Sequence, residues 1–346
     1  KTMINELLNL LLLYLLMAFL PAYFIFNWIN HQTENIKASV VLSLGIAPLL
    51  MSSLLYLMLL FLPGQSTVIY LLIAFSVLIG HMIFFRKKFN IAYAASKYPI
   101  TFDKTEKILA SLLLVFFVCT LAYSHWRPLS EHDTFEYMFL GKQLALEKQL
   151  IISKYRYNEA SGSYFIGLHG LLYPIFFTWQ SMFNQLMHTD SEWWFKSLSG
   201  YYSMLFLSVF ILYLKSINPK WLVLGLCMLL SSFAMVFSIL QFHLEMIRMF
   251  LFLAVVYMSI TYIESPRNQI NILGILLGLQ AGVHFIGLVI SIISLGLLFF
   301  FLQQTYAMRF KMLMKQCIIF ILCGSIHYIL EYFMGDGYWW QKITGN

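Results

Sequence analysis

Long apolar stretches constrain this chain more than any other feature. The runs from Ile4 to Ile29 and from Ala38 to Leu62, and several later ones, approach or exceed the roughly 20 apolar residues that a helix needs to cross a bilayer core. Inside a bilayer, the protein itself must satisfy every backbone N–H and C=O group, which leaves helices and closed barrels as spanning structures. Continuous runs of this length indicate helices. We therefore predict an all-α, polytopic transmembrane protein.

The composition supports this prediction. Of the 346 residues, 60% are hydrophobic and 11% are charged, whereas a soluble domain has about 45–50% apolar and about 25% charged residues. The net charge of +7 could suggest nucleic acid. However, the Lys and Arg residues lie mainly between apolar runs, where the positive-inside rule places them. We expect no nucleic-acid partner. The four cysteines lie inside apolar runs and show no metal-ligand or disulfide pattern.

The first apolar runs give a provisional topology. The basic stretch that follows Phe85 and continues to Lys107 is the strongest signal for a cytoplasmic loop. The next span therefore leads outward, and the long region 125–196 becomes the first large extracytoplasmic loop. The first run is too long for a cleaved signal peptide. The four predicted spans are Ile4–Ile29 (kinked at Pro21), Ala38–Leu62, Thr67–Phe85 and Ile108–Ser124.

Two segments of the loop are predicted to lie in the membrane interface. Asp133–Gln149 can form a helix with acidic and amide side chains along one stripe. Tyr164–Phe183 is apolar but is interrupted by glycines and a proline, which favours an interfacial or re-entrant helix. If this segment spanned the membrane, Lys215 and Lys220 would fall outside, against the positive-inside rule.

The remaining apolar runs bring the total to about ten predicted spans. We divide the chain into an N-terminal transmembrane module, 1–107, and a transmembrane core, 108–346. The chain opens on Lys-Thr-Met and closes on Thr-Gly-Asn, so we expect the natural protein to extend further at both ends. The later spans are Ser197–Leu214, Trp221–Gln241, Leu244–Ile263, Ile270–Val283, Phe285–Leu302 and, after a basic loop containing Arg309, Lys311 and Lys315, Gln316–Phe333.

An acidic cluster marks the start of the loop. Glu131, His132, Asp133 and Glu136 lie within six positions of a chain that has few acids. A fixed Asp133 carboxylate could accept the proton of an attacking hydroxyl. Glu131 and Asp133 could instead hold a divalent cation such as Mg²⁺ or Mn²⁺. A plainer alternative is that Asp133 caps the helix and Glu136 is its N3 partner.

Other ionisable residues are predicted to lie on the same outer side. Arg248 suits a phosphate ligand, although Glu245 is three residues away and could simply neutralise it in an ion pair. His243 precedes that pair. His284 lies at the tip of a tight helical pair, and His169 lies in the loop; each could equally be a packing histidine bonded to a carbonyl. Ionisable groups near apolar spans usually line a functional cavity.

The order of these pieces resembles the GT-C superfamily of membrane glycosyltransferases, especially the bacterial protein O-mannosyltransferases and aminoarabinose transferases. The shared features are a span followed by Glu131-His132-Asp133 and Tyr137, then the segment GLHGLLYP, then the pair AGVHFIGL bearing His284. The resemblance covers about 108–333. The first 85 residues do not fit the usual start of that family.

The resemblance implies a function and a set of roles. Asp133 would be the general base or a metal-linked carboxylate, and Glu131 would support it. The donor would be a sugar on a polyprenyl phosphate, and the acceptor would be a glycan, lipid or protein outside a bacterial plasma membrane. The substrate cavity would be lined by Arg248, His284, His243, Glu245, His169 and Tyr137.

Two other functions remain open at this point. A transporter or flippase of a lipid-linked substrate would use Glu245, Arg248 and His284 as a central site, but transporters place such sites near the midplane between repeats. A non-catalytic scaffold subunit of a membrane complex would tolerate substitution of Asp133 and His284.

Overall fold

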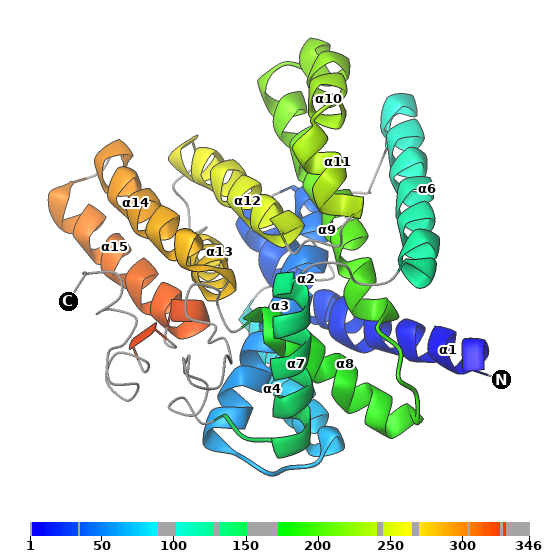
Figure 1. The fold of residues 1–346 in the computed structure, drawn as a ribbon. Helices are drawn as coiled ribbons and strands as arrows, with labels where there is room; N and C mark the ends of the chain where they lie inside the picture. The colour runs from blue at the N-terminus through cyan, green and yellow to red at the C-terminus, as the bar shows by residue number, and fades with distance from the viewer. Residues whose placement is uncertain are drawn as a thin grey trace, which may run out of the picture.

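The computed structural model describes residues 2–33, 35–88, 102–127, 132–150, 172–240, 245–264, 270–302, 305–325 and 328–329. These residues fold almost entirely into helices (Figure 1). The elements are α1 Thr2–Tyr14, a π-turn Leu15–Phe19, α2 Leu20–Thr33, α3 Ile36–Phe61, α4 Thr67–Lys88, α6 Lys104–Trp126, α7 His132–Glu147, α8 Leu172–Met187, α9 Trp193–Ile217, a 3-10 turn Pro219–Trp221, α10 Leu222–Leu230, α11 Phe233–Leu240, α12 Glu245–Glu264, α13 Ile270–Val283, α14 Phe285–Phe301, α15 Tyr306–Phe320 and a π-turn Ile321–Ser325.

Within the described part of the chain, five helical segments are long and apolar enough to cross a membrane. They are Met3–Thr33, Ile36–Phe61, Thr67–Phe84, Lys104–Trp126 and Trp193–Ile217. Among the described residues, α13 and α14 contribute shorter apolar helices. This set is compatible with a multi-pass helical membrane protein, as the sequence predicted. The larger total of about ten spans stays a prediction.

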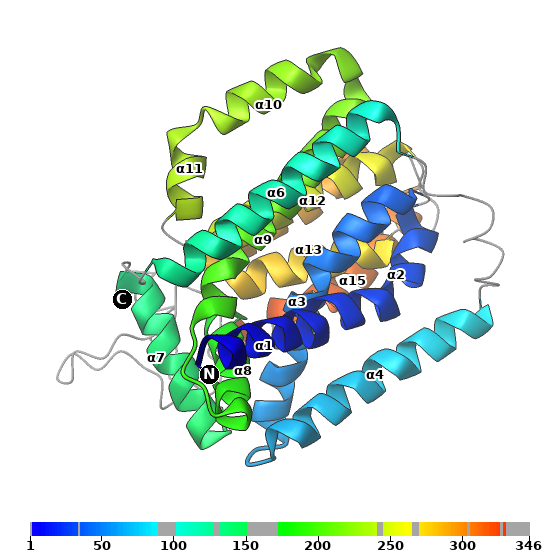
Figure 2. The same cartoon turned by 90° about the vertical axis from the view of Figure 1, so that its right-hand side faces the viewer.

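Helix contacts define two ends of the bundle. At one end, which we call the α7 end, the α3–α4 turn meets the end of α7 through a hydrogen bond from Gly64 N to Lys148 O (2.8 Å). At the opposite end, Lys37 at the start of α3 pairs with Glu106 near the start of α6 (2.6 Å). Figure 2 shows α6, α9, α12 and α13 running between these ends, with α7 and α8 across one of them.

Helix α8 remains at the α7 end along its whole length. Its first residues contact α7, and Asn184 near its last turn receives a hydrogen bond from Asn9 and donates one to Ser191 O, just before α9. With 16 residues, it lies along α7 and does not cross the bundle. The described part of Tyr164–Phe183 is thus a helix packed along α7, and its place in the membrane interface stays a prediction. Lys215, at the far end of α9, pairs with Glu106 at the opposite end.

A regular row of glycines lets the last helices pack tightly. Gly274, Gly278 and Gly282 recur every four residues on α13, so they share one face. A Cβ atom at Gly278 would lie 2.8 Å from Phe320 O of α15 and 2.7 Å from Cβ of Cys323. This is the small-residue spacing that allows close helix approach in membranes. From Ile272 to Val283, every α13 residue except Ile275 is buried, which makes it a central helix of this half of the molecule.

Proline is accommodated near the N-terminus by a change of helix type. Pro21 lacks the backbone N–H that an α-helix uses at that position, and its ring would crowd the carbonyl of Met17. Met17 lies inside the π-turn Leu15–Phe19, which widens the helix where this carbonyl must move. The predicted disturbance near Pro21 therefore takes the form of a π-turn one turn earlier.

The predicted span Trp221–Gln241 is wrong as a single helix. The chain forms α10 and α11, with a break at Ser231 and Ser232. The Ser231 hydroxyl donates a hydrogen bond to Met228 O (2.9 Å), a local bond that competes with continuing the helix. Both pieces are too short to span in the α-helical form, since each residue adds about 1.5 Å of length.

The last predicted span begins earlier than expected. Helix α15 starts at Tyr306, so Arg309, Lys311 and Lys315 belong to the helix and not to a preceding loop. After Phe320 the helix widens into a π-turn. Residues 330–346, which include the end of the predicted span, lie outside the described residues.

Helices from both predicted segments of the chain contribute to one buried core. In the N-terminal segment, Tyr14 shares a hydrogen bond with Ser197 of α9 (2.6 Å). Tyr201 and Tyr202, also of α9, donate hydrogen bonds to backbone carbonyls of α3. These contacts attach the first helices to the rest of the molecule. Whether the division at residue 107 separates two functions stays a prediction.

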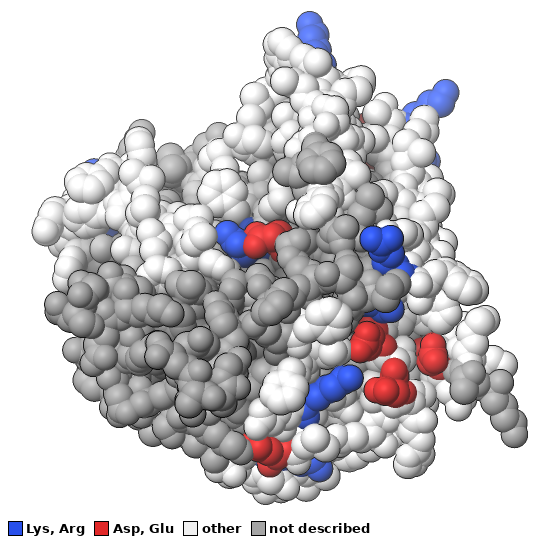
Figure 3. Space-filling view, in the orientation of Figure 1, with Lys and Arg blue, Asp and Glu red and all other residues white. Residues whose placement is uncertain are grey.

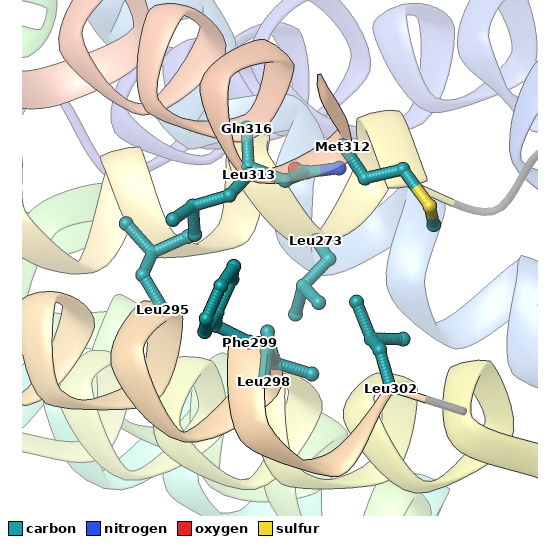
Figure 4. A pocket seen from close by; sticks show the side chains of 8 residues that line it. All are labelled: Leu273, Leu295, Leu298, Phe299, Leu302, Met312, Leu313 and Gln316. Atoms are coloured by element: carbon teal, nitrogen blue, oxygen red, sulfur yellow. The ribbon is translucent and has the colours of Figure 1, made fainter. Parts of the chain in front are cut away.

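Gln316 of α15 is a buried polar side chain that lines a small cavity among the last helices. A cavity of about 20 Å³ lies between α13, α14 and α15, and Gln316 is the polar residue in an apolar lining (Figure 4). The cavity has room for about one water molecule. Within the described part of the chain, neither the oxygen nor the nitrogen of the Gln316 amide has a hydrogen-bond partner.

The glycine face gives a direct test of the packing. We expect Gly278→Ala to lower stability by about 1–3 kcal/mol, because the added methyl group must displace backbone and Cβ atoms of the neighbouring turn. The matched control is Gly296→Ala on α14, where a new Cβ meets no atom within 4 Å. That change should raise stability by about 0.5–1 kcal/mol through helix propensity. Thermal unfolding of the purified protein in detergent measures both, and equal shifts would contradict the packing.

Candidate functional site

Three of the predicted site residues lie outside the described residues. They are Glu131, His169 and His243. Asp133 is described as part of helix α7, but its side chain is not. The structure therefore tests the candidate site through Tyr137, Glu245, Arg248 and His284, and through the position of α7.

Asp133 occupies the first turn of a helix. Helix α7 begins at His132, so Asp133 lies within the helix and is not the residue that precedes it. The alternative that Asp133 is the N-cap, with Glu136 as its N3 partner, does not agree with this start of α7. A carboxylate in the first turn is favourable because the N-terminal end of a helix carries partial positive charge.

The N-terminal half of α7 is held against α8. The ring of Tyr137 packs edge-on against that of Tyr173, with centroids 5.4 Å apart. One turn later, Gly141 allows close approach, since a Cβ there would lie 2.6 Å from Pro174 O. Tyr137 and Tyr173 are both buried. This packing fixes the helix that carries Asp133 against the helix that carries Tyr173.

Tyr173 in turn links α7 and α8 to the start of α12. Burial raises the pKa of the Tyr173 phenol well above its usual range, and the nearby Glu245 carboxylate raises it further. The Arg248 guanidinium opposes this effect, so both α12 residues lie within electrostatic range of Tyr173. The phenol stays neutral at physiological pH and can act as a hydrogen-bond donor or acceptor.

Glu245 and Arg248 form an ion pair in the first turn of α12, which is one of the two alternatives that the sequence left open. An Arg248 guanidinium nitrogen lies 2.5 Å from a Glu245 carboxylate oxygen. The Arg248 side chain is 22% exposed and that of Glu245 is 41% exposed. The guanidinium has five donors, of which this contact uses one. The remaining donors keep a second anion chemically feasible at Arg248.

His284 lies at the junction of α13 and α14 at the α7 end. Its Nδ1 accepts a hydrogen bond from Ile286 N (3.0 Å), so the histidine is the N-cap of α14. An acceptor Nδ1 places the proton of a neutral ring on Nε2. Two residues earlier, a Cβ on Gly282 would lie 2.9 Å from Leu172, the neighbour of Tyr173. His284 therefore has the local structural role weighed above, although its partner is a backbone N–H and not a carbonyl.

Lys196 is a further candidate site residue that the sequence pattern did not indicate. Lys196 lies in the first turn of α9, is 9% exposed, and donates a hydrogen bond to Arg127 O (3.0 Å). A buried lysine beside an apolar span is costly and commonly marks a functional position. The signal was its place in the run WWFKSLSG, where one cation interrupts apolar residues. Figure 3 shows acidic and basic side chains meeting on the face seen in Figure 1.

The described residues give no support for a metal centre of their own. Among them, no group of three or more His, Cys, Asp or Glu side chains is arranged to hold a metal ion. Glu245 is already paired with Arg248. The proposed ligands Glu131 and Asp133 are not described to their side chains, so the metal stays a prediction and no chemical step below depends on it.

No protein-family model, curated protein or solved structure matches this chain.

The Tyr137–Tyr173 contact can be tested by substitution. We expect Tyr137→Ala to cost about 3–5 kcal/mol, because it empties a buried aromatic site. Amide hydrogen exchange over residues 132–147 should then rise, since the turn bearing Asp133 loses its support. Tyr137→Phe keeps the ring and should cost about 1 kcal/mol. Unchanged exchange in the alanine variant would show that this contact does not hold α7.

Proposed function

We propose that the protein is a membrane glycosyltransferase of GT-C type that moves a sugar from a polyprenyl-phosphate carrier to an acceptor outside a bacterial plasma membrane. The observation that supports this best is the meeting of three elements at the α7 end. These are the first turn of α7 with Asp133, the Tyr137–Tyr173 pair, and the Glu245–Arg248 pair of α12. The proposal draws on these groups together: Asp133 as the base, the tyrosine hydroxyls as hydrogen-bonding groups, and Arg248 as the cation.

The proposed reaction is a single displacement at the anomeric carbon. The acceptor hydroxyl gives its proton to the Asp133 carboxylate while its oxygen forms the new bond to the sugar. The bond between the anomeric carbon and the phosphate oxygen breaks, and its electron pair leaves with the polyprenyl phosphate. A phosphate is a good leaving group, so it needs cationic stabilisation more than a proton.

Arg248 is the proposed phosphate ligand. A guanidinium binds phosphate oxygens with two parallel hydrogen bonds, and Glu245 occupies only part of its donor set. Glu245 holds the side chain in one direction and so positions it. Lys196 supplies a second cation at the same end, which was not among the residues expected from the sequence.

The position of these residues favours a transferase over a transporter. Transporters keep substrate sites near the midplane, between structural repeats. Here the polar elements are first turns of α7 and α12 and the junction before α14, all at one end of the bundle. A site at the membrane border suits a lipid-linked donor whose sugar projects into water.

The role of Asp133 has a matched control. We expect Asp133→Asn to lower sugar transfer by about 10²–10⁴-fold, because the amide cannot accept the proton. Asp190→Asn changes an exposed acid just before α9 at the same end and should leave transfer unchanged. The assay follows labelled sugar from a panel of polyprenyl-phosphate donors in proteoliposomes. Full activity of the Asp133 variant, with the control also active, removes the catalytic assignment.

A second substitution separates donor binding from simple charge pairing. We expect Arg248→Gln to raise KM for the donor at least tenfold, while changing stability by no more than about 1 kcal/mol, as for other partly exposed pairs. Glu245→Gln should disturb KM less. Lys142→Gln, which loosens the Lys142–Glu192 contact (3.8 Å) at the same end, is the control. If both α12 variants lose stability and neither changes KM, the pair is structural only.

A further inference from the structure

A second hollow lies far from the candidate site, near the opposite end of the bundle. It has a volume of about 500 Å³ and lies between α3, α6 and α9. This volume falls within the range of about 300–1,000 Å³ that is typical of ligand sites. We call it the α6 groove. Its walls are mainly aliphatic, from residues such as Val40, Val41, Leu109, Leu113, Met204 and Ile211.

The groove is formed by helices long and apolar enough to cross a membrane, and it opens on the side of α6. All three of its helices are among the five segments long enough to cross a bilayer. Leu114 lines the groove but remains 59% exposed. Only 6% of the apolar window of α6 is buried inside the protein, compared with 67% for α9. In a membrane, hydrocarbon chains would therefore surround α6 and reach the mouth of the groove.

One end of the groove carries a charged rim. Lys37 donates a hydrogen bond to Glu106 (2.6 Å), and its ammonium lies 5.3 Å from the centre of the Phe102 ring. Glu106 also accepts a hydrogen bond from Lys215 (2.7 Å), and Lys215 donates another to Asp103 (2.9 Å). The charges of Lys37, Lys215, Glu106 and Asp103 cancel within this network, and side chains of both signs remain partly exposed.

The length of the groove matches one leaflet of a bilayer. From Glu106 to Leu114 along α6 is a rise of about 12 Å at about 1.5 Å per residue. The lining residues of α9, from Met204 to Leu212, cover a similar length. Half of a typical hydrocarbon core is about 15 Å. A hydrocarbon chain whose polar end stays at the rim would thus follow the groove through most of one leaflet.

We propose that the α6 groove binds one acyl chain of a membrane phospholipid, with a zwitterionic headgroup at the rim formed by Lys37, Phe102 and Glu106. The apolar lining takes the chain, and the paired charges of the rim complement a headgroup that also carries both signs. The phospholipid belongs to the leaflet at the end opposite α7. A polyprenyl phosphate that presents its sugar at the α7 end would also have its phosphate at that end. The rim of the α6 groove lies at the opposite end. The proposal does not depend on the transferase function.

Photocrosslinking tests the site in the full-length chain. The protein is reconstituted in vesicles of phosphatidylethanolamine that contain a trace of the same lipid with a diazirine near the end of one acyl chain. We expect crosslinks to concentrate on lining residues such as Leu113 and Met204. Crosslinks spread evenly over α6, including its outward residues Leu112, Val115 and Val118, would mean ordinary surrounding lipid and would overturn the proposal.

Two variants fill the groove from different walls. Ala110→Trp fills it from α6 and Ser208→Phe fills it from α9, and each should lower crosslinking to the lining at least fivefold. Leu112→Trp adds the same bulk outside the groove, where Leu112 is 59% exposed, and should have no effect. Two variants are used because one of them could fail to fold. Thermal unfolding of each purified variant shows whether it is folded. Crosslinking that persists in both folded variants overturns the proposal.

Two competitors identify the chemistry of the occupant. Unlabelled phosphatidylethanolamine should compete with the probe, and an equal amount of polyprenyl phosphate should compete at least fivefold less well. Stronger competition by polyprenyl phosphate would overturn the phospholipid assignment. Because neither filling variant touches the α7 end, sugar transfer in these variants should remain at the unmodified level even if the groove is blocked.

Discussion

The rest of the structure depends on the cost of placing charge in hydrocarbon. Ionisable groups in a bilayer must pair, reach water or line a cavity. The five segments long enough to span a membrane carry their charges near their ends. Two charged regions follow from this. One joins Lys37, Glu106 and Lys215 at the starts of α3 and α6 and the end of α9. The other joins Glu245 and Arg248 at the start of α12, close to Tyr173.

Close backbone packing decides which helix ends meet at the α7 end. In a membrane, helices gain little from hydrophobic contact alone, and small residues that admit close approach gain importance. The glycines of α13 bring α15 and the following π-turn against that helix, and Gly282 lies against Leu172 at the start of α8. Gly141 does the same for α7 and α8. These contacts place the junction at His284 and the first turn of α7 on the same side of the bundle.

The two proposed sites use opposite ends of one bundle. The α7 end has a carboxylate in a first helical turn, tyrosine hydroxyls, the partly exposed Arg248 and the buried Lys196. In the proposed function, these groups serve transfer from a phosphate. The α6 groove is almost entirely aliphatic and has a charge-balanced rim. These features suit the binding of a hydrocarbon chain and not a chemical reaction. Helix α9 contributes to both, with Lys196 near one end and Lys215 near the other.

The sequence by itself determined the class of the molecule, since runs of about 20 apolar residues with basic residues between them admit few folds. It also predicted most helices and the pairing of Glu245 with Arg248, because both depend on local spacing. It missed the break between α10 and α11, where serines compete locally with a uniformly apolar pattern. Only the tertiary structure decided which ends meet. Tyr173 beside α12, Lys37 beside Lys215, and the α6 groove all join residues far apart in the chain, and composition carries no information about such contacts.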